Sequence, residues 1–446
     1  MGARLAWAVA DLDRGHAEVD GRRDDTMIVR TVCVVGLGYI GLPTAVVLAQ
    51  AGHRVIGVDV SDHRINLINQ GALPFHEQGL ETALEEVVAT GALVAQRDVP
   101  AADVYIIAVP TPFAAGHRAD LSYIEAAGRA IAPLLSHDGL VILESTSPPG
   151  TTRRLADVIL AERSDLTLDG AEGAPVVHFA HAPERVLPGR ILVELVENDR
   201  VIGGLTARAG ILARDLYSSF CRGDLLLTEA ETAEMVKLTE NAFRDVNIAF
   251  ANELSIICAE LGIDVWKLID LANHHPRVQI LRPGPGVGGH CIAVDPWFII
   301  SAAPQASRLL RAARDVNDAK PGFVAQEVRR AMAQVERPVV AALGLAYKAD
   351  VDDLRESPAV AVVAELARGL PRAQILAIEP HVSSLPEELA GLESVELASL
   401  ADGLPQANIV VLLVNHSEFG GISLRDLEGK HVVDSCGAWH ASSSTG

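Results

Sequence analysis

The sequence lacks the features that mark secreted, membrane-spanning and nucleic-acid-binding proteins. Its five cysteines are dispersed and show no Cys-x-x-Cys spacing, which argues against a disulfide framework or a zinc site and fits a reducing cytoplasm. The absence of Cys-x-x-Cys spacing leads us to expect no resident metal. The sequence has no run of about 18 apolar residues, so we expect no membrane span and no membrane partner. The formal net charge of −21 argues against nucleic acid as the main partner.

Aromatic residues are also scarce, at 4%, whereas hydrophobic residues make up 49% of the 446-residue chain. Ala, Val and Leu dominate, which suits α/β layers with buried parallel strands. A chain of this length exceeds one ordinary core, so two or three domains are expected. Residues 1–26 are rich in Arg and Asp and carry only a short apolar run. We predict a disordered tail over 1–27, with Met27 as an alternative start.

Apolar runs separated by helical stretches predict an open parallel sheet in the first half of the chain. The order strand, turn, helix and strand up to Asp59 is typical of a β-turn-α-β unit. Its elements are a strand at Val29–Gly36, a helix at Leu42–Gly52 and a strand at His53–Asp59, with further strands at Val104–Val109, Leu140–Ser145 and Val176–Ala180.

The middle of the chain is rich in Ala, Leu, Ile and Glu, and it predicts helices over Ala230–Leu261 and Val265–Ala272. These helices are too apolar for a solvated linker, so we expect them to pack between domains or between subunits. Strands then return and imply a second, smaller α/β sheet, with strands at Val339–Leu345, Gln374–Ile378, Ile409–Leu413 and His431–Ser435. The expected domains are a Rossmann-like domain over 28–215, a central helical dimerisation domain over 216–320 and a smaller α/β domain over 321–446.

The first turn carries a dinucleotide-binding fingerprint, Gly-x-Gly-x-x-Gly, formed by Gly36, Gly38 and Gly41. The first glycine allows the tight turn, the second lets the backbone approach a pyrophosphate, and the third permits close helix–strand packing. Asp59, at the end of the second strand, is expected to accept hydrogen bonds from the adenosine ribose. Because a carboxylate there would repel a 2′-phosphate, NAD is favoured over NADP.

Other residues of the same crevice complete the expected cofactor site. Thr111 and Thr146 follow two further strands, and ligands sit at the carboxyl ends of strands in such sheets. Turn and cap chemistry is the alternative role for these two threonines. We also assign Tyr39 and Ile40 of the glycine turn and Arg64 to the cofactor.

Cys291 lies in a Gly/Pro-rich segment, 283–296, that suggests chemistry beyond one hydride transfer. A thiolate can trap an aldehyde as a hemithioacetal, which a second hydride transfer turns into a thioester that water cleaves. Lys237 and Asn241 share one face of the long predicted helix and can stabilise an oxyanion. A small buried thiol and a solvated polar helix face are the alternative readings.

Three charged residues in loops extend this constellation. Glu184 follows a strand of the first domain and can activate the hydrolytic water, with a surface salt bridge as the alternative. Lys348 and Arg355 follow a strand of the second sheet, and two cations there suit pyrophosphate recognition. We assign Arg355 to the cofactor and Lys348 to the substrate.

Together these motifs resemble the UDP-glucose/GDP-mannose dehydrogenase family over nearly the whole chain. The segments 144–149, 183–189, 198–204, 240–254 and 276–298 look most like members that act on UDP-N-acetyl-D-mannosamine. The resemblance implies a four-electron oxidation of the sugar C6 alcohol to a uronic acid with two NAD and one water. It also implies a helical dimer-forming middle and a C-terminal domain that grips the UDP.

The resemblance also implies roles for individual residues. Cys291 is the nucleophile, Lys237 and Asn241 stabilise the tetrahedral states, Asp295 supports proton transfer, and Glu184 handles the water. Further substrate contacts fall on Arg185, Val186, Gly288 and Arg277, the last reaching into a neighbouring subunit's site.

One position departs from the pattern of UDP-glucose dehydrogenases, which usually carry Lys immediately before the aspartate of the cysteine motif. Here that position is Val294, as in the N-acetylhexosamine branch of the family. UDP-N-acetylglucosamine and UDP-glucose remain alternative substrates. A one-hydride dehydrogenase with a structural Cys291 and a non-catalytic NAD-binding regulatory protein remain alternative functions.

Overall fold

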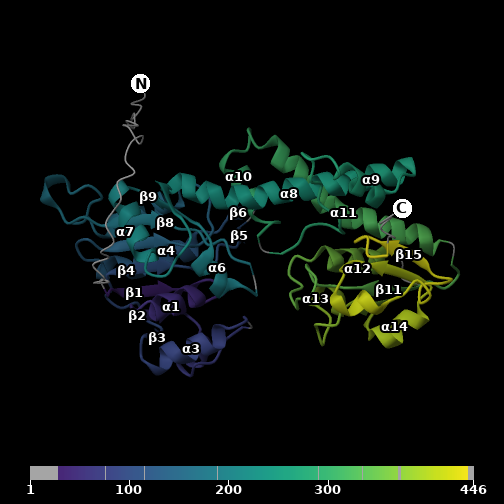
Figure 1. The fold of residues 1–446 in the computed structure, drawn as a ribbon, viewed down its shortest axis with the longest axis horizontal. Helices are drawn as coiled ribbons and strands as arrows, with labels where there is room; N and C mark the ends of the chain where they lie inside the picture. The colour runs from purple at the N-terminus through teal and green to yellow at the C-terminus, as the bar shows by residue number, and fades with distance from the viewer. Residues whose placement is uncertain are drawn as a thin grey trace.

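The computed structural model describes residues 29–439 except 76, 115, 188, 290, 334 and 370–372, so the predicted tail over 1–27 lies outside the described residues. Two β-sheets lie at opposite ends of the molecule, and the long helix α8 runs across one side of both (Figure 1). No described helix is long and apolar enough to cross a membrane. The structure is a mixed α/β fold with helical segments between two sheets, as predicted.

The first sheet has eight strands in the order β10-β9-β8-β7-β4-β1-β2-β3. All neighbours are parallel except β8 and β9, which pair antiparallel through His181 and Gly203, so the prediction of a purely parallel sheet is wrong at this edge. The strands are β1 (Thr31–Val35), β2 (Arg54–Val58), β3 (Leu93–Gln96), β4 (Val104–Ile107), β7 (Leu140–Leu143), β8 (His178–His181), β9 (Arg200–Gly204) and β10 (Leu225–Glu229).

Both faces of this sheet are buried. Because alternate residues of each strand point to opposite faces, each strand contributes side chains to both cores. In β1, Val32 and Val34 join one core cluster, whereas Val35 and the fully buried Cys33 join another. The covering helices are α1 (Gly41–Gln50), α2 (Asp62–Asn69), α3 (Leu80–Ala89), α4 (Ser122–Ile131), α5 (Thr151–Glu162), α6 (Ile191–Glu197) and α7 (Ala207–Tyr217). A small hairpin, β5 (Phe113–Ala114) and β6 (Arg118–Ala119), follows β4.

The central segment is helical, and α8 (Ala230–Leu261) and α9 (Val265–Ala272) have the predicted bounds. Gly262 ends α8 with φ +67°, a left-handed conformation that glycine adopts at low cost. Two later helices, α10 (Asp295–Ala302) and α11 (Arg308–Met332), pack on α8. Helix α8 therefore links the first sheet to the rest of the chain.

The second sheet is parallel throughout, with the order β13-β12-β11-β14-β15. Its four longer strands were predicted, and the short β13 was not. The strands are β11 (Val339–Leu343), β12 (Gln374–Ile378), β13 (Val395–Leu397), β14 (Ile409–Leu412) and β15 (His431–Asp434), and the helices around them are α12 (Pro358–Gly369), α13 (Glu387–Ala390) and α14 (Leu400–Gln406).

Candidate active site

The glycine turn between β1 and α1 is shaped to receive a phosphate group. Gly36 has φ +95°, and a Cβ there would lie 2.6 Å from the carbonyl oxygen of Ala108. A Cβ on Gly41 would lie 1.9 Å from the carbonyl oxygen of Gly36. At Gly38, by contrast, no atom lies within 4 Å of an added Cβ, so this side of the turn is open. The turn thus fits the pyrophosphate of a dinucleotide, which needs close approach to the backbone.

Asp59 closes the same turn from the end of β2. Its carboxylate accepts hydrogen bonds from the N–H groups of Leu37 (3.0 Å) and Ser61 (2.9 Å) and pairs with the guanidinium of Arg64 (2.9 Å). Burial acts to raise the pKa of Asp59, but these hydrogen bonds and the charge of Arg64 outweigh it and lower the pKa. The carboxylate is therefore ionised at the place where a ribose would bind.

The two predicted threonines meet at the carboxyl edge of the sheet, where the Thr111 hydroxyl donates to the backbone carbonyl of Thr146 at 2.6 Å. Tyr39 turns its hydroxyl to Glu77, donating at 2.8 Å, and Ile40 is the N-cap residue of α1. The buried Glu77 also accepts from the N–H groups of Gly189 and Ile191, both at 2.9 Å. Glu77 thereby ties the glycine turn to the loop that carries Glu184, a link that the sequence did not predict.

The structure brings four predicted catalytic residues together from two helices and the loop between them. Asn241, on α8, donates to the carboxylate of Asp295 at 2.6 Å, and Asp295 begins α10. The backbone carbonyl of Cys291 accepts from the N–H of Asp295 at 2.9 Å. The ammonium of Lys237, one turn before Asn241, acts electrostatically on both Cys291 and Asp295.

Electrostatics in this cluster keep the thiol protonated at rest. Solvent reaches Cys291, but the protein atoms around it and the charge of Asp295 raise its pKa, while Lys237 and Arg355 act to lower it. Burial raises the pKa of Asp295 to about 6, against the opposing effects of Asn241 and Lys237. The raised pKa of Asp295, beside a thiol and a cation, suits this carboxyl group to proton transfer near neutral pH.

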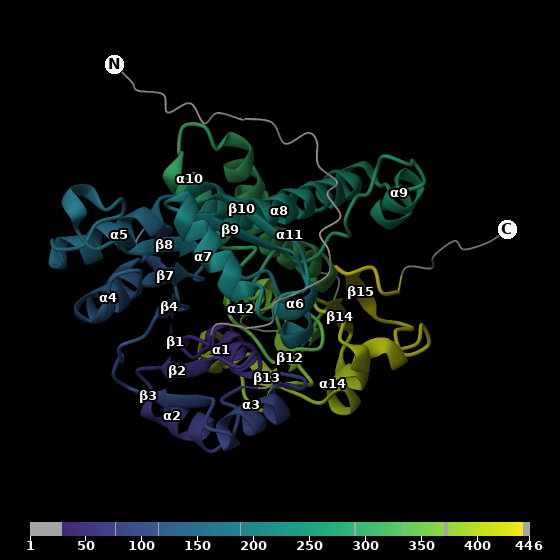
Figure 2. The same ribbon diagram turned by 60° about the vertical axis from the view of Figure 1, so that its left-hand side comes forward.

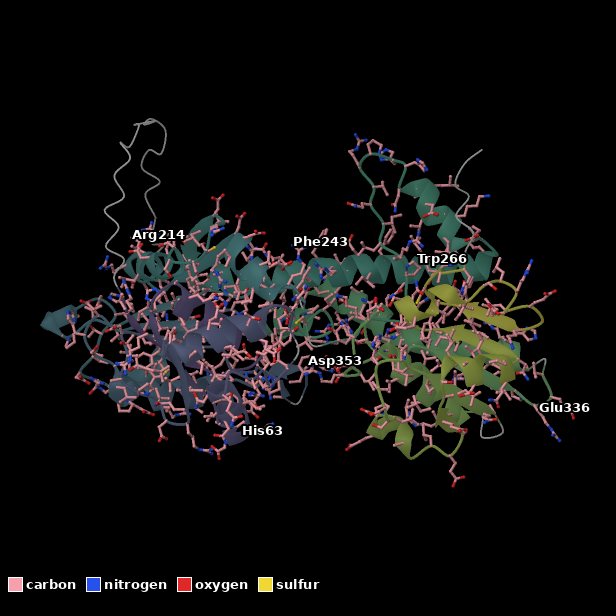
Figure 3. The ribbon with its side chains drawn as sticks, turned by 60° about the horizontal axis from the view of Figure 1, so that its bottom comes forward. His63, Arg214, Phe243, Trp266, Glu336 and Asp353 are labelled. Atoms are coloured by element: carbon pink, nitrogen blue, oxygen red, sulfur yellow. The ribbon has the colours of Figure 1, made fainter. Side chains whose placement is uncertain are left out.

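The glycines before Cys291 dock the loop onto the C-terminal domain. A Cβ on Gly288 would lie 2.4 Å from the carbonyl oxygen of Glu356, and one on Gly289 would lie 2.8 Å from the ring of Tyr347. The segment that contributes these groups also carries Arg355, which forms a two-pronged ion pair with Asp353. Figure 3 places Asp353 between the two halves of the molecule. Residues from the central helical segment and from the C-terminal domain therefore lie around the thiol.

Glu184 is not a surface salt bridge but part of a buried network. Its carboxylate lies 2.6 Å from the guanidinium of Arg200, whose other nitrogen lies 3.6 Å from the carboxylate of Glu144. Tyr217 donates to Glu144 at 2.6 Å, and the guanidinium stacks over the Tyr217 ring at 4.5 Å. Burial raises the pKa of Glu144 to about 7, so one arginine serves two buried acids. Arg200 and Glu144 were missed as site residues; a buried arginine at a strand start is recognisable only from the fold.

The remaining predicted residues lie around this centre at different depths. Arg185 is tied to α8 through Glu240 at 2.6 Å, and Val186 packs beside α6. Lys348 is exposed on the loop after β11. Arg277 is exposed after α9 and forms no ion pair with any described residue.

Family models match three consecutive parts of the chain. Residues 30–221 match the NAD-binding domain of the UDP-glucose/GDP-mannose dehydrogenase family, residues 231–319 its central domain, and residues 341–441 its UDP-binding domain. The matched segments contain the glycine turn, the helix with Lys237 and the cysteine loop, and the loop with Lys348.

Individual relatives match along their whole length. The chain is 53% identical over 413 residues to the NDP-N-acetyl-D-galactosaminuronic acid dehydrogenase of Ralstonia nicotianae, covering 92% of this chain and 97% of the relative. It is 49% identical over 422 residues to the UDP-N-acetyl-D-mannosamine dehydrogenase of Escherichia coli, covering 93% and 100%. A solved UDP-N-acetylmannosamine dehydrogenase from Pyrococcus horikoshii superposes with a TM-score of 0.81 at 38% identity, covering 92% of this chain and 96% of that one.

Proposed function

Because the chain belongs to the UDP-glucose/GDP-mannose dehydrogenase family and is an NAD-dependent UDP-sugar dehydrogenase, we propose that it oxidises UDP-N-acetyl-D-mannosamine at C6 to UDP-N-acetyl-D-mannosaminuronate. The observation that carries the proposal is the meeting of Cys291, Asp295, Asn241 and Lys237. A simple one-hydride dehydrogenase has no need of a thiol beside a raised-pKa acid and a cation. The enzyme is expected in the cytoplasm.

In this proposal the thiol changes the course of the reaction after the first oxidation. Bound NAD supplies the hydride acceptor, and two equivalents with one water convert a primary alcohol to a carboxylate. The thiol of Cys291 loses its proton and adds to C6 of the aldehyde, forming a hemithioacetal. Lys237 and Asn241 stabilise the oxygen that becomes negative, and Asp295 carries protons. Loss of the second hydride from C6 leaves a thioester on Cys291.

Glu184 is proposed to direct the water that cleaves this thioester. The ion pair with Arg200 at 2.6 Å holds the carboxylate in one place, and the N–H of Arg185 donates to its other oxygen at 2.7 Å. Water adds to the thioester carbonyl, the C–S bond breaks, and the thiol of Cys291 is restored as the acid leaves. Arg200 is a positioning residue in this account, since it acts through Glu184.

The choice of hexosamine rests on the relatives and on Val294. The E. coli and P. horikoshii relatives are named for UDP-N-acetylmannosamine, which favours that substrate. A nucleotide-linked N-acetylgalactosamine is the second candidate, because the R. nicotianae relative is more similar, at 53% identity. UDP-N-acetylglucosamine and UDP-glucose differ from UDP-N-acetylmannosamine at C2 of the sugar ring, so they belong in the same comparison.

A panel of UDP-sugars, scored by NADH yield and product mass, tests the proposal. UDP-N-acetylmannosamine is expected to give the highest kcat/KM and two NADH per sugar, with a uronic acid as product. One NADH per sugar with an aldehyde product would contradict the cysteine route. A higher kcat/KM with UDP-N-acetylgalactosamine would change the assigned substrate but not the proposed cysteine route. NAD binding without turnover of any sugar would favour a regulatory role.

We also propose that two copies pair through α8 and share their sites. Phe243, Phe250, Ile257 and Leu261 are exposed and spaced by seven, seven and four residues, so they share one helix face. Phe243 is 70% exposed and points away from the body in Figure 3, and α9 projects beyond both sheets in Figure 2. Such a patch on a globular protein marks an interaction surface. The exposed Arg277 would then reach the partner's site.

Mixing two inactive variants tests the shared site. Arg277→Ala chains and Cys291→Ala chains are expected to regain part of the activity when they form mixed dimers, because one of the two sites then has both residues. Each variant alone is the control. No recovery in verified mixed dimers would contradict a site completed by Arg277 of the other chain.

A further inference from the structure

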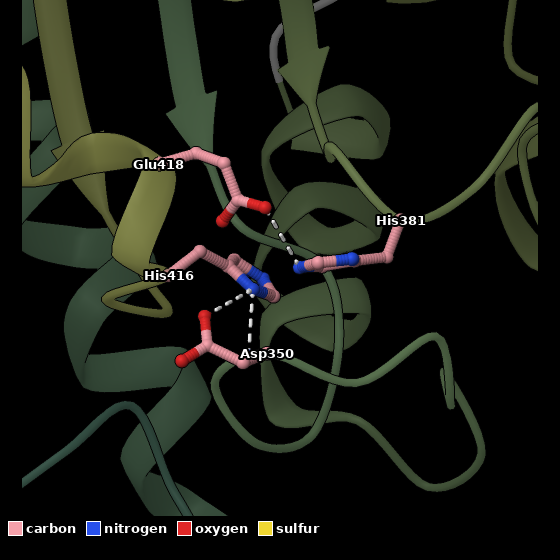
Figure 4. A group of neighbouring side chains, drawn as sticks. All are labelled: Asp350, His381, His416 and Glu418. Carbon is pink, nitrogen blue, oxygen red and sulfur yellow. Dashed lines mark hydrogen bonds and ion pairs between the residues drawn. The ribbon is translucent and has the colours of Figure 1, made fainter.

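A cluster of two histidines and two carboxylates lies in the C-terminal domain, in addition to the groups used above (Figure 4). Asp350, His381, His416 and Glu418 each offer one ligand atom, and these atoms all lie within 4.8 Å of one another. The residues come from three loops that follow β11, β12 and β14. Because these strands are neighbours in a parallel sheet, their carboxyl ends bring the loops to one edge.

The contacts of His416 fix which of its two ring nitrogens carries the lone pair. The imidazole is buried, and its Nε2 lies 3.0 Å from the carboxylate of Glu379. Glu379 also accepts from the N–H groups of Leu345 (2.7 Å) and Ala346 (3.0 Å). The N–H of Asp350 donates to Nδ1 of His416 at 3.0 Å, so Nδ1 carries no proton and Nε2 donates to Glu379. Metal-binding histidines are commonly oriented by a carboxylate in this way.

His381 provides a separate indication of a ligand. Its Nε2 is buried and has no hydrogen-bond partner among the described residues, although the carboxylate of Glu418 lies 3.5 Å away. Its ring centroid is 4.9 Å from that of His416. Buried polar atoms are nearly always hydrogen-bonded, so a ring nitrogen with only this longer ion pair and no hydrogen bond indicates a missing partner.

We propose that Asp350, His381, His416 and Glu418 bind a divalent transition-metal ion, best matched by Zn²⁺. Two imidazoles and two carboxylates suit Zn²⁺ better than Mg²⁺ or Ca²⁺, which prefer oxygen ligands alone. Ligand atoms about 2.1 Å from zinc in a tetrahedron lie about 3.4 Å apart, so the present cluster must contract. The exposed Asp350 and Glu418 can make this movement.

Binding exchanges one hydrogen bond for a metal–ligand bond. The N–H of Asp350 now donates to Nδ1 of His416 at 3.0 Å, and the ion would take over that lone pair. Lys348 lies two residues before Asp350 on the loop after β11. The ion would therefore tie this loop to the loops after β12 and β14, stabilising the C-terminal domain and fixing the segment assigned to the UDP-sugar.

Zinc binding by the full chain tests the site. The Cys291→Ser variant is the starting protein, because the reactive thiol is itself a zinc ligand. After removal of metal, it is titrated with Zn²⁺ against a chromophoric chelator, and a second titration with Co²⁺ reports the ligands through its visible spectrum. One equivalent is expected, with a spectrum of nitrogen and oxygen ligands and a rise in melting temperature.

Single substitutions then locate the ion. Adding His381→Ala or Glu418→Ala to that protein is expected to weaken Zn²⁺ about 100-fold or more and to abolish the rise in melting temperature. His63→Ala, at an exposed histidine of α2, is the matched control and should change neither value. His381 lies in a loop and Glu418 in the short 3₁₀ helix Ser417–Gly421, and melting of the metal-free variants checks that they fold. Unchanged affinity in His381→Ala and Glu418→Ala, or no zinc bound at all, would overturn the proposal.

Discussion

The two sheets contain the same kind of glycine turn, but the turn has a different role in each sheet. After β1, Gly36 turns with φ +95° and its N–H donates to the carbonyl of Val58, while Asp59 accepts from the N–H of Leu37.

After β11, Gly344 turns with φ +86° and its N–H donates to the carbonyl of Ile378 at 2.9 Å. There the acid is Glu379, which accepts from Leu345 and Ala346. In both, an acid at the end of the neighbouring strand fastens the residues after a glycine turn.

The difference lies in what each turn leaves free. In the first sheet the third turn residue is Gly38, whose surroundings are open, and Asp59 faces a partly exposed arginine. In the second sheet Ala346 takes that place and is buried, and His416 contacts the same oxygen of Glu379 that accepts from Leu345 and Ala346. The glycine turn with its acid therefore binds a ligand in the first sheet and stabilises the domain in the second. Charged side chains such as Lys348, rather than backbone N–H groups, are left to meet phosphate there.

The largest effect should come from filling the open turn. Gly38→Val is expected to raise the KM for NAD on the order of 100-fold, because the side chain occupies the space for the pyrophosphate. No atom lies within 4 Å of the new Cβ, so the melting temperature should change little. Ala346→Gly, at the matching position of the second turn, is the control and should leave the KM for NAD unchanged. Equal effects of the two variants on the KM for NAD would contradict the claim that only the first turn binds the cofactor.

Removing the two acids should separate binding from stability. Asp59→Ala is expected to weaken NAD about 10-fold or more, and more than it weakens NADP, since hydrogen bonds from the ribose to a carboxylate are lost. Glu379→Ala should leave NAD binding unchanged but lower the free energy of unfolding by about 1–3 kcal/mol, because four donors lose their acceptor. Steady-state kinetics and chemical denaturation measure the two effects. A wild-type enzyme that used NADP as well as NAD would contradict the role given to Asp59.

A smaller effect distinguishes the acid of the catalytic cluster from the acid of the turn. Asp59, with a lowered pKa, stays ionised across the working range, whereas Asp295 has a pKa of about 6. The carboxylate form of Asp295 is present above that value, so kcat should fall as the pH decreases through about 6. Asp295→Asn should lose this limb of the pH profile along with most of its activity, whereas Asp59→Asn should keep it. A limb that persisted in Asp295→Asn would assign it to another group.

Local patterns made much of the fold predictable. Strands buried on both faces form continuous apolar runs, and α8 ends where Gly262 stops an unbroken helical stretch. The missed strands lack such runs: β9 begins with the buried Arg200 and ends in two glycines, and β10 carries exposed leucines. Strand direction was not predictable either, because it depends on which edge a strand joins. The antiparallel β8–β9 pair is such a case.

The candidate site likewise contains parts that the sequence predicts and parts that it does not. The glycine turn and the cysteine loop are short motifs, and the sequence predicts both. The contact of Glu184 with Arg200, and that of Arg200 with Glu144, join residues 16 and 56 positions apart, and no spacing rule links them. The ligands proposed for zinc come from three separate loops, so cysteine and histidine spacing predicts no metal there. Such constellations depend on the tertiary fold.

The most direct test of the cysteine route is a single turnover experiment with Cys291→Ala at saturating UDP-N-acetyl-D-mannosamine and NAD. Product mass and NADH are measured together, and binding of both ligands is checked by titration. The account predicts intact binding and no uronic acid above background, because no thioester can form. The matched Glu184→Gln variant should instead accumulate covalent thioester, visible as added mass on the intact chain. Uronic acid formed by Cys291→Ala at near the wild-type rate would show that the cysteine is structural and would contradict the account.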